Sequence, residues 1–268
     1  MSSFKFDAAK EWFEKLRDKL VNSFENLGNE KFIITEWDHK SEGGGKMSKL
    51  KSSIIEKGGV NISSVSGVFD ENMVGKIPGT ENDLSYKATG ISVVFHPVSP
   101  HIPSMHFNTR YLQTEKEWFG GGIDITPCLT YVDEKNYHLS LEKMCNRFDK
   151  SYYTKYKKWC DDYFYLPHRK EPRGIGGIFF DYLHSEDWGK DFEFVQAVGN
   201  FFHDYSFRVI KDLKDHSWNQ DEKNIQLLKR SRYAEFNLLH DRGTRFGLET
   251  GGNIDAILMS MPPLAKWE

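Results

Sequence analysis

Two neighbouring segments of alternating polarity, joined by a proline-rich connection, constrain the fold of this chain more than any other feature. Residues 88–96 and 104–113 alternate in side-chain character, and a period of two is typical of strands with two different faces. Pro97, Pro100 and Pro103 lie in the connection between them. Because each proline fixes its φ angle, the connection is stiff and holds the two segments in a defined relative placement. The sequence therefore predicts two neighbouring strands.

Polar side chains gather on one face of these strands. In the second strand, His106, Asn108 and Arg110 share one side, because successive side chains of a strand point to opposite faces. In the first strand, Ser92 and His96 also share one side. The opposite face of the second strand carries Met105, Phe107, Thr109 and Tyr111. A single strand histidine is usually a satisfied structural group, but two His, an Asn and an Arg on one face favour a binding or catalytic site.

The remaining chain divides into blocks of strands and helices. We expect further strands at residues 31–37, 51–56, 60–66, 118–132, 178–183 and 254–261. We expect helices from Asp7, as the cap, to Gly28 and at residues 134–148, 150–164, 191–213 and 222–229. Gly43–Gly45 is predicted to interrupt the early strands, as a turn or as a loop that folds over a ligand. The order of strands, helices and strands indicates an α+β fold of one domain, residues 1–268, with an antiparallel sheet covered by helices.

Residues 231–253, SRYAEFNLLHDRGTRFGLETGGN, are predicted to form a hairpin. Apolar and polar residues alternate from Tyr233 to His240, which suits a strand with one face on the core. Asp241-Arg242-Gly243 has the composition of a turn, and residues 244–248 return as a second strand. An isolated turn of this kind is most simply a solvated corner. The polar residues elsewhere in the chain favour a site there, with Asp241 and Arg242 at the corner.

Charge and aromatic content limit the classes of ligand. The formal charge of −3 gives no basic field that would attract nucleic acid or an anionic membrane. Aromatic residues make up 15% of the chain, and such rings fill cores or line apolar pockets. Arginines on the sheet face and in loops pair bidentately with carboxylates, and they are Arg110, Arg169, Arg173 and Arg242. This inventory suits an apolar ligand that carries several acidic groups.

Short motifs that would indicate an organic cofactor or a known catalytic template are absent from the sequence. There is no HExxH, GxSxG or EF-hand pattern. Gly45-Lys46 lacks the other residues of a phosphate-binding loop, and the Gly174-x-Gly176 pair lacks the third glycine of a dinucleotide site. We therefore expect no organic cofactor.

Cysteine spacing and hydropathy indicate the compartment. Cys128, Cys145 and Cys160 form neither a CxxC pair nor an even disulfide framework, which predicts reduced thiols in the cytoplasm. Neither a secretory signal nor an apolar run of transmembrane length is visible. The sequence thus predicts a cytoplasmic chain without a transmembrane segment.

The chain resembles the oxygen-dependent coproporphyrinogen III oxidase family over nearly its whole length. The resemblance rests on ordered blocks, which are ISVVFHP, HFNTR, WFGGGIDITP, KKWCDDYF, HRKEPRGIGGIFFD, SRYAEFNLLHDRGTRFGL and ILMSMPP. It implies a large, rather flat antiparallel sheet between layers of helices, a homodimer and no organic cofactor. It also implies oxidative decarboxylation of two propionates of coproporphyrinogen III to vinyl groups, with molecular oxygen as co-substrate. The products would be protoporphyrinogen IX, carbon dioxide and hydrogen peroxide, a step of heme biosynthesis.

The resemblance also implies roles for individual residues. His106 would be the proton donor, and Asp241, as a carboxylate, would accept hydrogen bonds from pyrrole N–H groups and favour a pyrrole anion that attacks oxygen. Arg110 would act with them and hold a substrate carboxylate. The implied substrate contacts are Ser92, Asn108, Thr109, Arg110, Arg242, Gly251, Gly252 and Asn253, where Asn253 stands in place of the arginine of many members. Bacterial members are described with a divalent metal at four histidines, which correspond to His96, His106, His138 and His168.

Two other classes of function remain open from the sequence. A non-catalytic tetrapyrrole-binding carrier would use the same pocket but consume no oxygen. A metal-dependent hydrolase built on the histidines would lose its activity to a chelator.

Overall fold

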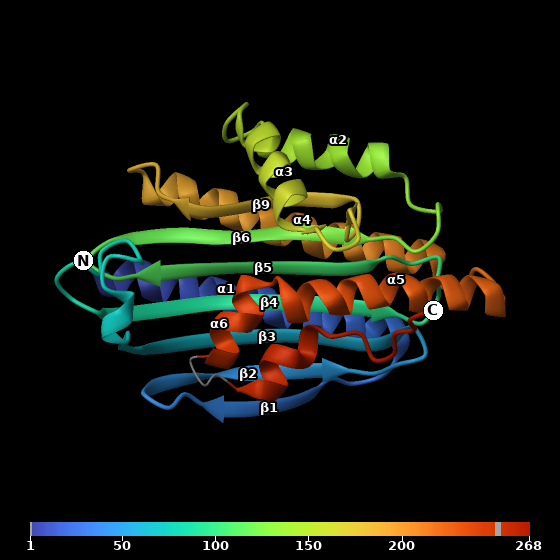
Figure 1. The fold of residues 1–268 in the computed structure, drawn as a ribbon, viewed down its shortest axis with the longest axis horizontal. Helices are drawn as coiled ribbons and strands as arrows, with labels where there is room; N and C mark the ends of the chain where they lie inside the picture. Colours follow the sequence, from blue (N-terminus) through green and yellow to red (C-terminus); the bar gives the residue numbers. More distant parts are fainter. Residues whose placement is uncertain (1, 250–252) are drawn as a thin grey trace.

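A seven-stranded antiparallel sheet forms the centre of the computed structural model, which describes residues 2–249 and 253–268 (Figure 1). The strand order is β1-β2-β3-β4-β5-β6-β9, so only the last neighbour is not consecutive in the chain. The strands are β1 (Ile33–Asp38), β2 (Glu42–Leu50), β3 (Ile55–Val68), β4 (Ser85–Pro97), β5 (Ser104–Gln113), β6 (Glu117–Thr126) and β9 (Gly176–Leu183). The short strands β7 (Tyr165–Leu166) and β8 (Glu171–Pro172) pair separately.

Helices lie on both faces of the sheet. They are α1 (Ser2–Gly28), α2 (Glu134–Cys145), α3 (Tyr152–Tyr163), α4 (Trp188–Leu213), α5 (Gln220–Leu239), α6 (Arg242–Glu249) and α7 (Ile254–Ile257), with 3-10 turns η1 (Glu71–Met73) and η2 (Leu258–Ser260). On one face, α1 packs against β3 and β4, and α4 packs against β5 and β6. In Figure 1, α5 crosses in front of the other face, α6 lies in front of its middle, and α2 and α3 lie beside β9. The predicted α+β fold, with a flat antiparallel sheet between helical layers, is confirmed.

Aromatic side chains fill the layer between the sheet and the pair α1 and α4. Phe107 stacks on Phe202 with ring centroids 5.1 Å apart, and Phe24 meets Phe95 at 4.3 Å. Because Met105, Phe107 and Tyr111 of β5 are fully buried here, the polar residues of β5 must face the other layer. The predicted separation of an apolar and a polar face on this strand is confirmed.

The predicted hairpin at residues 231–253 is wrong where the structure describes it. Residues 220–239 form the helix α5, and residues 242–249 form α6. The buried positions of α5 include Arg230, Tyr233 and Asn237, which recur every three or four residues as a helix requires. Since several of these buried residues are polar, the apolar pattern alone did not reveal the helical period.

Several other boundaries differ from the expectations, among them the predicted strand 118–132, of which residues 127–132 lie outside β6. Helix α1 begins at Ser2, so Asp7 lies inside it and is not its cap, although the predicted end at Gly28 is correct. Gly43–Gly45 belongs to β2 and is not a loop. A Cβ at Gly43 or Gly44 would lie 2.1 Å from a carbonyl oxygen of a neighbouring strand, so the strand has no room for a side chain at these positions. Residues 51–54 lie outside the strands, between β2 and β3. The apolar segment 254–261 forms α7 and η2 and is not a strand.

In the part of the chain that the structure describes, none of the helices combines the length and the apolar character that a membrane span requires.

Candidate functional site

The polar face of the sheet is a row of functional side chains bordered by small residues. Antiparallel register places Asp124 of β6 opposite His106, Gly122 opposite Asn108, and Gly120 opposite Arg110. On the other side, β4 places Val94, Ser92 and Gly90 opposite the same three residues of β5. Two of these neighbours on β6 and one on β4 are glycine. This part of the sheet face therefore exposes backbone, without side chains, between its polar groups. Such a floor suits a flat ligand that lies across the strands.

His106 is oriented by Asp124 at one end of this row. His106 Nδ1 lies 2.7 Å from Asp124 Oδ1, so the ring donates Nδ1–H to the carboxylate. Asn108 Nδ2 donates to the other ring nitrogen, Nε2, at 3.3 Å. In this arrangement Nδ1 is the donor of the ring and Nε2 is its acceptor. The His106 side chain is 16% exposed and that of Asp124 is 4% exposed, so the histidine forms the accessible edge of a buried pair.

Arg173 neutralises Asp124 from the loop before β9. Arg173 Nη2 donates to Asp124 Oδ2 at 2.5 Å, and both side chains are nearly inaccessible to solvent. Burial opposes ionisation of Asp124, but the Arg173 charge and the His106 hydrogen bond outweigh it and lower the pKa of this carboxyl. Asp124 is therefore a charged acceptor that keeps His106 in one tautomer and would stabilise the imidazolium after proton uptake.

Helix α5 closes this end of the site around the Arg173 guanidinium. Arg173 Nη1 donates to Asn237 Oδ1 at 2.7 Å. The guanidinium carbon lies 4.1 Å from the ring centroid of Phe164, 4.3 Å from that of Tyr233 and 4.9 Å from that of Phe236. Such contacts between a cation and ring faces compensate part of the cost of burying the charge. The polar residues on the inner side of α5 thus complete the network that begins at His106.

His96 belongs to the same region but is a structural group in this arrangement. Its Nε2–H donates to the Ser260 carbonyl oxygen at 2.9 Å, and its Nδ1 lies 3.0 Å from Ser104 Oγ. Burial is the main cause that lowers the pKa of His96 to about 3. A neutral His96 therefore ties β4 to η2, and Asn237 Nδ2 donates to Ser260 Oγ at the same place.

Arg110 lies at the other, more open end of the row. Arg110 Nη2 donates to Asp181 Oδ2 at 2.7 Å across Gly120, and the Arg110 side chain is 39% exposed. Ser92 and Asn108 are half-buried between the two ends. The structure thus brings together four predicted residues: His106, Asn108, Arg110 and Ser92.

Thr109 does not join this group. Its side chain belongs to the opposite face of β5 and is 1% exposed. The Oγ1 atom of Thr109 is buried and has no hydrogen-bond partner in the described part of the chain. A substrate contact through the Thr109 side chain would require a different face of the sheet from the one that carries Arg110.

Asp241 and Arg242 lie where α5 ends and α6 begins. Asp241 caps α6, because its Oδ2 accepts from the N–H and the hydroxyl of Thr244 at 2.7 and 2.8 Å. Its Oδ1 accepts from the Tyr163 hydroxyl at 2.8 Å. The Arg242 guanidinium carbon lies 5.1 Å from the Tyr163 ring centroid and 5.9 Å from that of Phe179. Phe179 pairs with Gly122, so this corner lies beside the row on β5 and β6.

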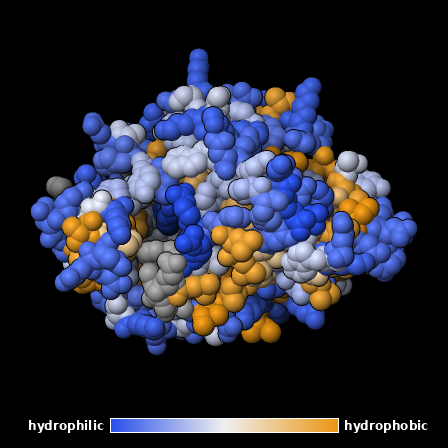
Figure 2. Space-filling view, viewed as in Figure 1, coloured by the Kyte–Doolittle hydropathy of each residue, from blue (hydrophilic) through white to orange (hydrophobic). Residues whose placement is uncertain are grey.

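Residues near the C-terminus contribute less to the described site. Asn253 caps α7, since its side chain accepts from the Ala256 N–H. Gly251 and Gly252, two predicted substrate contacts, lie outside the described residues. Apolar surface gathers where α5 meets α6 and α7 (Figure 2). Its exposed members include Leu238, Leu239, Leu248 and Ile254.

The four histidines expected for a divalent metal do not share one site. His138 Nε2 bonds to the Ile175 carbonyl oxygen, whereas His168 bonds to Glu235 and His240. His96 and His106 are held by the separate partners described above. Among residues 2–249 and 253–268, no group of three or more His, Cys, Asp or Glu side chains is arranged to hold a metal ion. The predicted set of His96, His106, His138 and His168 therefore does not fit a common metal within this chain.

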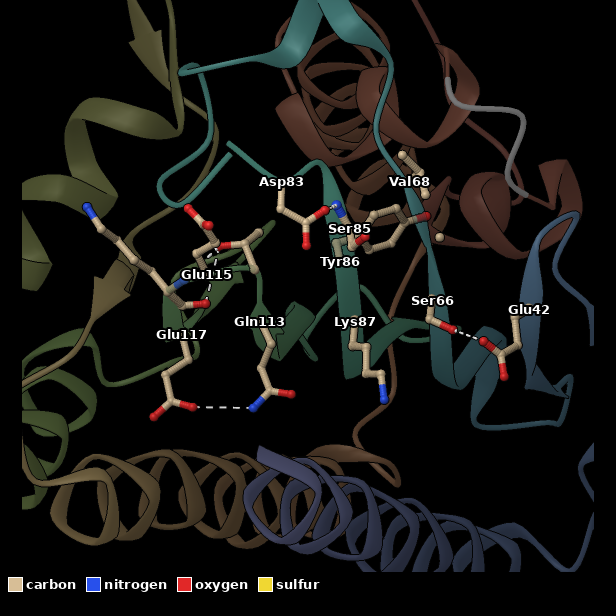
Figure 3. A pocket seen from close by; sticks show the side chains of 13 residues that line it. Glu42, Ser66, Val68, Asp83, Ser85, Tyr86, Lys87, Gln113, Glu115 and Glu117 are labelled. Atoms are coloured by element: carbon tan, nitrogen blue, oxygen red, sulfur yellow. Dashed lines mark hydrogen bonds between the residues drawn. The ribbon is translucent and has the colours of Figure 1, made fainter. Parts of the chain in front are cut away.

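Two surface cavities lie away from the polar row. One, of about 580 Å³, lies at the end of the sheet among Lys87, Gln113 and Glu117 (Figure 3). The other, of about 700 Å³, is lined by residues of α2, α3 and the loop 172–175. Neither cavity is lined by any of the predicted site residues. We assign the site to the sheet face because the paired ionisable groups and the glycine floor are there, and because cavity size alone carries no chemistry.

Several residues of the site were not selected from the sequence. Arg173 was expected among the arginines for an acidic ligand, but its contact with Asp124 depends on how the loop before β9 lies against β6. Tyr163 was not among the expected site residues, although its hydroxyl holds Asp241. Asp181 was missed, although the IFFD block preceding the β9 end carries it. The GGG run beside the strand that bears Arg110 was the available signal. Glycines have no side chains, so they leave room for the side chain of a neighbouring strand to lie across them.

Comparison with known proteins agrees with the sequence blocks. A model of the coproporphyrinogen III oxidase family matches residues 8–268. The oxygen-dependent coproporphyrinogen-III oxidase of Rickettsia bellii (strain OSU 85-389) is 47% identical over 97% of this chain and 98% of its own length. The protein of the same name from Rickettsia akari (strain Hartford) is 48% identical over 96% of each chain. On this evidence of sequence, which spans nearly all of the sheet and the helices around it, the chain belongs to the coproporphyrinogen III oxidase family.

Proposed function

We propose that this protein is an oxidoreductase that converts coproporphyrinogen III to protoporphyrinogen IX with molecular oxygen, a step of heme biosynthesis. For each of two propionates, the carboxyl group leaves as carbon dioxide and the side chain becomes a vinyl group. The two electrons and two protons released reduce one oxygen molecule to hydrogen peroxide. The observation that carries the proposal is the row from His106 to Arg110, which joins a buried acid–histidine pair to an exposed arginine over a glycine floor.

The residues of the row divide the work of binding and proton transfer. Arg110 is suited to a propionate, because its guanidinium presents N–H groups to a carboxylate. His106 Nε2 is the accessible nitrogen that can take a proton and return it, while Asp124 holds the ring and stabilises its charged form. Asn108 and Ser92, from neighbouring strands, supply polar contacts between them. The glycine floor lets the tetrapyrrole approach the backbone.

Asp241 is proposed as the carboxylate that favours the pyrrole anion. Its position near the Arg242 corner supports a role at the edge of the site, but both of its oxygens already accept hydrogen bonds from Tyr163 and Thr244. Burial and the neighbouring Asp241 charge raise the pKa of Tyr163 to about 12, so the phenol remains a donor. Oδ2 accepts two hydrogen bonds from Thr244 but Oδ1 accepts only one from Tyr163, so Oδ1 retains the capacity to accept a pyrrole N–H.

Oxygen acts as co-substrate in this proposal, and the organic chemistry needs no bound cofactor. The electron-rich pyrrole anion supplies the electrons for the attack on oxygen, and the peroxide formed can take the β-hydrogen of the propionate. Arg110 and the glycine floor hold the propionate in the correct position relative to the peroxide. No step is assigned to a divalent metal, since the four histidines do not fit one.

The remaining parts of the proposal concern the whole chain. We propose one catalytic domain over residues 1–268, supported by a family match that runs from residue 8 to the end. The thiols Cys128, Cys145 and Cys160 are free of disulfides, which supports a cytoplasmic location. We also propose the homodimer that the family resemblance implies, and sedimentation at catalytic concentration tests it.

Incubation with coproporphyrinogen III under air and under strict anaerobiosis tests the proposed function. Freshly purified protein, without added flavin or nicotinamide, should form protoporphyrinogen IX only under air, read as product fluorescence after oxidation. Oxygen uptake should accompany carbon dioxide release. Tetrapyrrole binding without oxygen uptake would instead identify a carrier, and turnover only with an added organic cofactor would contradict the proposal.

A further inference from the structure

The ion pair between Arg110 and Asp181 fixes a guanidinium that would otherwise be free. Asp181 Oδ2 accepts from Arg110 Nη2 at 2.7 Å, and Asp181 Oδ1 accepts from the Tyr182 N–H at 3.0 Å. The Asp181 side chain is 8% exposed, against 39% for Arg110. Since both oxygens are engaged and the acid is buried, the carboxylate is the fixed partner and the arginine is the accessible one.

Gly120 allows this pair to form across an intervening strand. Arg110 lies on β5 and Asp181 on β9, with Gly120 of β6 between them. A Cβ at Gly120 would lie 2.5 Å from Asp181 Oδ1, 3.0 Å from Arg110 Nη2 and 3.1 Å from Arg110 Cζ. Any larger residue would therefore push the guanidinium off the floor or displace the acid.

An irregularity of β9 aims Asp181 at this place. Phe119 pairs with Leu183 and Gly121 with Phe180, so Asp181 and Tyr182 together stand opposite the single residue Gly120. This arrangement of two residues against one is a β-bulge, which redirects a side chain and is frequent beside functional sites. Tyr182 has a φ of 53°, a left-handed conformation that costs free energy in a non-glycine residue. The strained bulge and the hydrogen bond to the Tyr182 N–H both serve to place the Asp181 carboxylate.

We propose that Asp181 is a positioning residue that holds Arg110 across Gly120 for recognition of a substrate carboxylate. This inference rests on the proposed function. Arg110 Nε and Nη1 have no hydrogen-bond partner in the described part of the chain, and they remain available to the ligand. Holding the guanidinium in advance reduces the conformational entropy that binding would otherwise cost. Asp181 also cancels much of the Arg110 charge, so recognition depends on the direction of the N–H groups more than on net charge.

Substitutions at Asp181 and Arg110, alone and together, test this role through kcat, KM and the Kd of coproporphyrin III measured by fluorescence quenching. Asp181→Ala should lower kcat/KM about tenfold, mainly through KM, because one charge-assisted contact is misplaced. Asp181→Asn should cause a smaller loss than Asp181→Ala, since its amide oxygen can accept from Arg110 or from the Tyr182 N–H but not from both. In an Arg110→Ala background, Asp181→Ala should cause no further loss. Asp162→Ala, an exposed acid of α3 paired with Lys158, is the matched control.

Gly120→Ala provides an independent variant, because it blocks the path of the guanidinium and keeps both charges. It should raise KM in the same direction as Asp181→Ala. An unchanged KM in Asp181→Ala, or a further loss in the Arg110→Ala background, would overturn the positioning role. Wild-type protein that fails to oxidise coproporphyrinogen III would instead contradict the proposed function. The positioning role would still be tested then by the Kd values, which must rise for both Arg110→Ala and Asp181→Ala.

Discussion

The two ends of the polar row on β5 are built from the same kind of parts, yet they differ in burial. At the His106 end, Asp124 and Arg173 are almost completely inaccessible and are enclosed by the rings of α5 and Phe164. At the Arg110 end, the acid is buried but the arginine is 39% exposed over Gly120. Arg173 is therefore shielded from solvent at one end, whereas Arg110 is accessible to solvent at the other.

Because of this difference, similar substitutions at the two ends should have different effects on stability and on substrate binding. A buried charge that loses its partner still carries the free-energy cost of its removal from water. A substitution at the His106 end should therefore lower both activity and the stability of the fold. At the Arg110 end the acid is buried but water screens the exposed arginine, so this pair contributes less to stability. The Arg110 end can therefore be changed with loss of binding and little loss of fold, and the predictions below separate the two effects.

The largest effect is expected for Asp124→Asn at the closed end. Removing the charge leaves the Arg173 guanidinium buried without compensation, which should lower the free energy of unfolding by about 3–5 kcal/mol. Urea titration of the variant beside Asp181→Asn measures the contrast, because the latter should change by less than about 1 kcal/mol. Equal losses at the two ends would remove the distinction between them.

Arg110→Ala should affect substrate use and leave the fold intact. Loss of one charge-assisted pair of about 1.5–3 kcal/mol corresponds to a fall in kcat/KM of roughly 10- to 150-fold. The melting temperature should fall only slightly, because the buried Asp181 loses its cation but keeps the hydrogen bond from the Tyr182 N–H. Normal kcat/KM would exclude Arg110 from the site, and an unfolded variant would identify it as structural.

The closed end should also make stability depend on pH through His96. Its pKa is lowered to about 3 in the folded state by burial, whereas the unfolded chain has the ordinary value near 6.5. The unfolded state therefore binds more protons between these values, and this contribution to stability is lost as pH falls below about 6.5. From pH 7 to pH 5, the loss attributable to His96 should be about 2 kcal/mol.

His96→Gln tests this dependence, because the glutamine amide can still donate to the Ser260 carbonyl but does not titrate. Urea titrations at both pH values should show a smaller loss in the variant by about 2 kcal/mol. An identical pH dependence in the two proteins would show that His96 is not the titrating group.

A small effect on stability is expected at the Asp241 corner. Asp241→Ala removes the cap of α6 and should cost about 1 kcal/mol, whereas Asp241→Asn keeps a capping oxygen and should cost less. If the Asp241 charge favours the pyrrole anion, Asp241→Asn should lower kcat by about 10²-fold or more. Near-normal kcat for oxygen uptake in the asparagine variant would leave Asp241 as the cap of α6 alone.

Strand β5 was predictable because its side chains alternate cleanly between an apolar and a polar face. The position of His106 opposite Asp124 was not, because the register of two strands depends on contacts between residues far apart in the sequence. The bulge at Asp181 could not be predicted from the sequence either, because one additional residue in a strand does not change the composition of that strand. The sheet and its polar face thus followed from local pattern, and the ion pairs that define the site followed from tertiary structure.

Helix α5 shows a different limit of the sequence pattern. Its inner side carries Gln226, Arg230 and Asn237, which are buried against polar groups of the sheet. Because burial there is satisfied by hydrogen bonds, the helix has no continuous apolar stripe, and an alternating pattern was mistaken for a strand. The helix expected at residues 222–229 is confirmed as the first part of α5, and Asn219 and Glu222 form a capping box at its start.

The most direct test of the site compares His106→Gln with Lys87→Gln, a variant in the cavity at the end of the sheet. kcat and KM for coproporphyrinogen III under air should be measured for both beside the wild type. His106→Gln should lower kcat by about 10²-fold or more, because it removes a proton-transferring group, while Lys87→Gln should retain normal kcat/KM. Normal kcat in His106→Gln together with a large loss in Lys87→Gln would place the chemistry in that cavity and contradict the assignment to the polar face of the sheet.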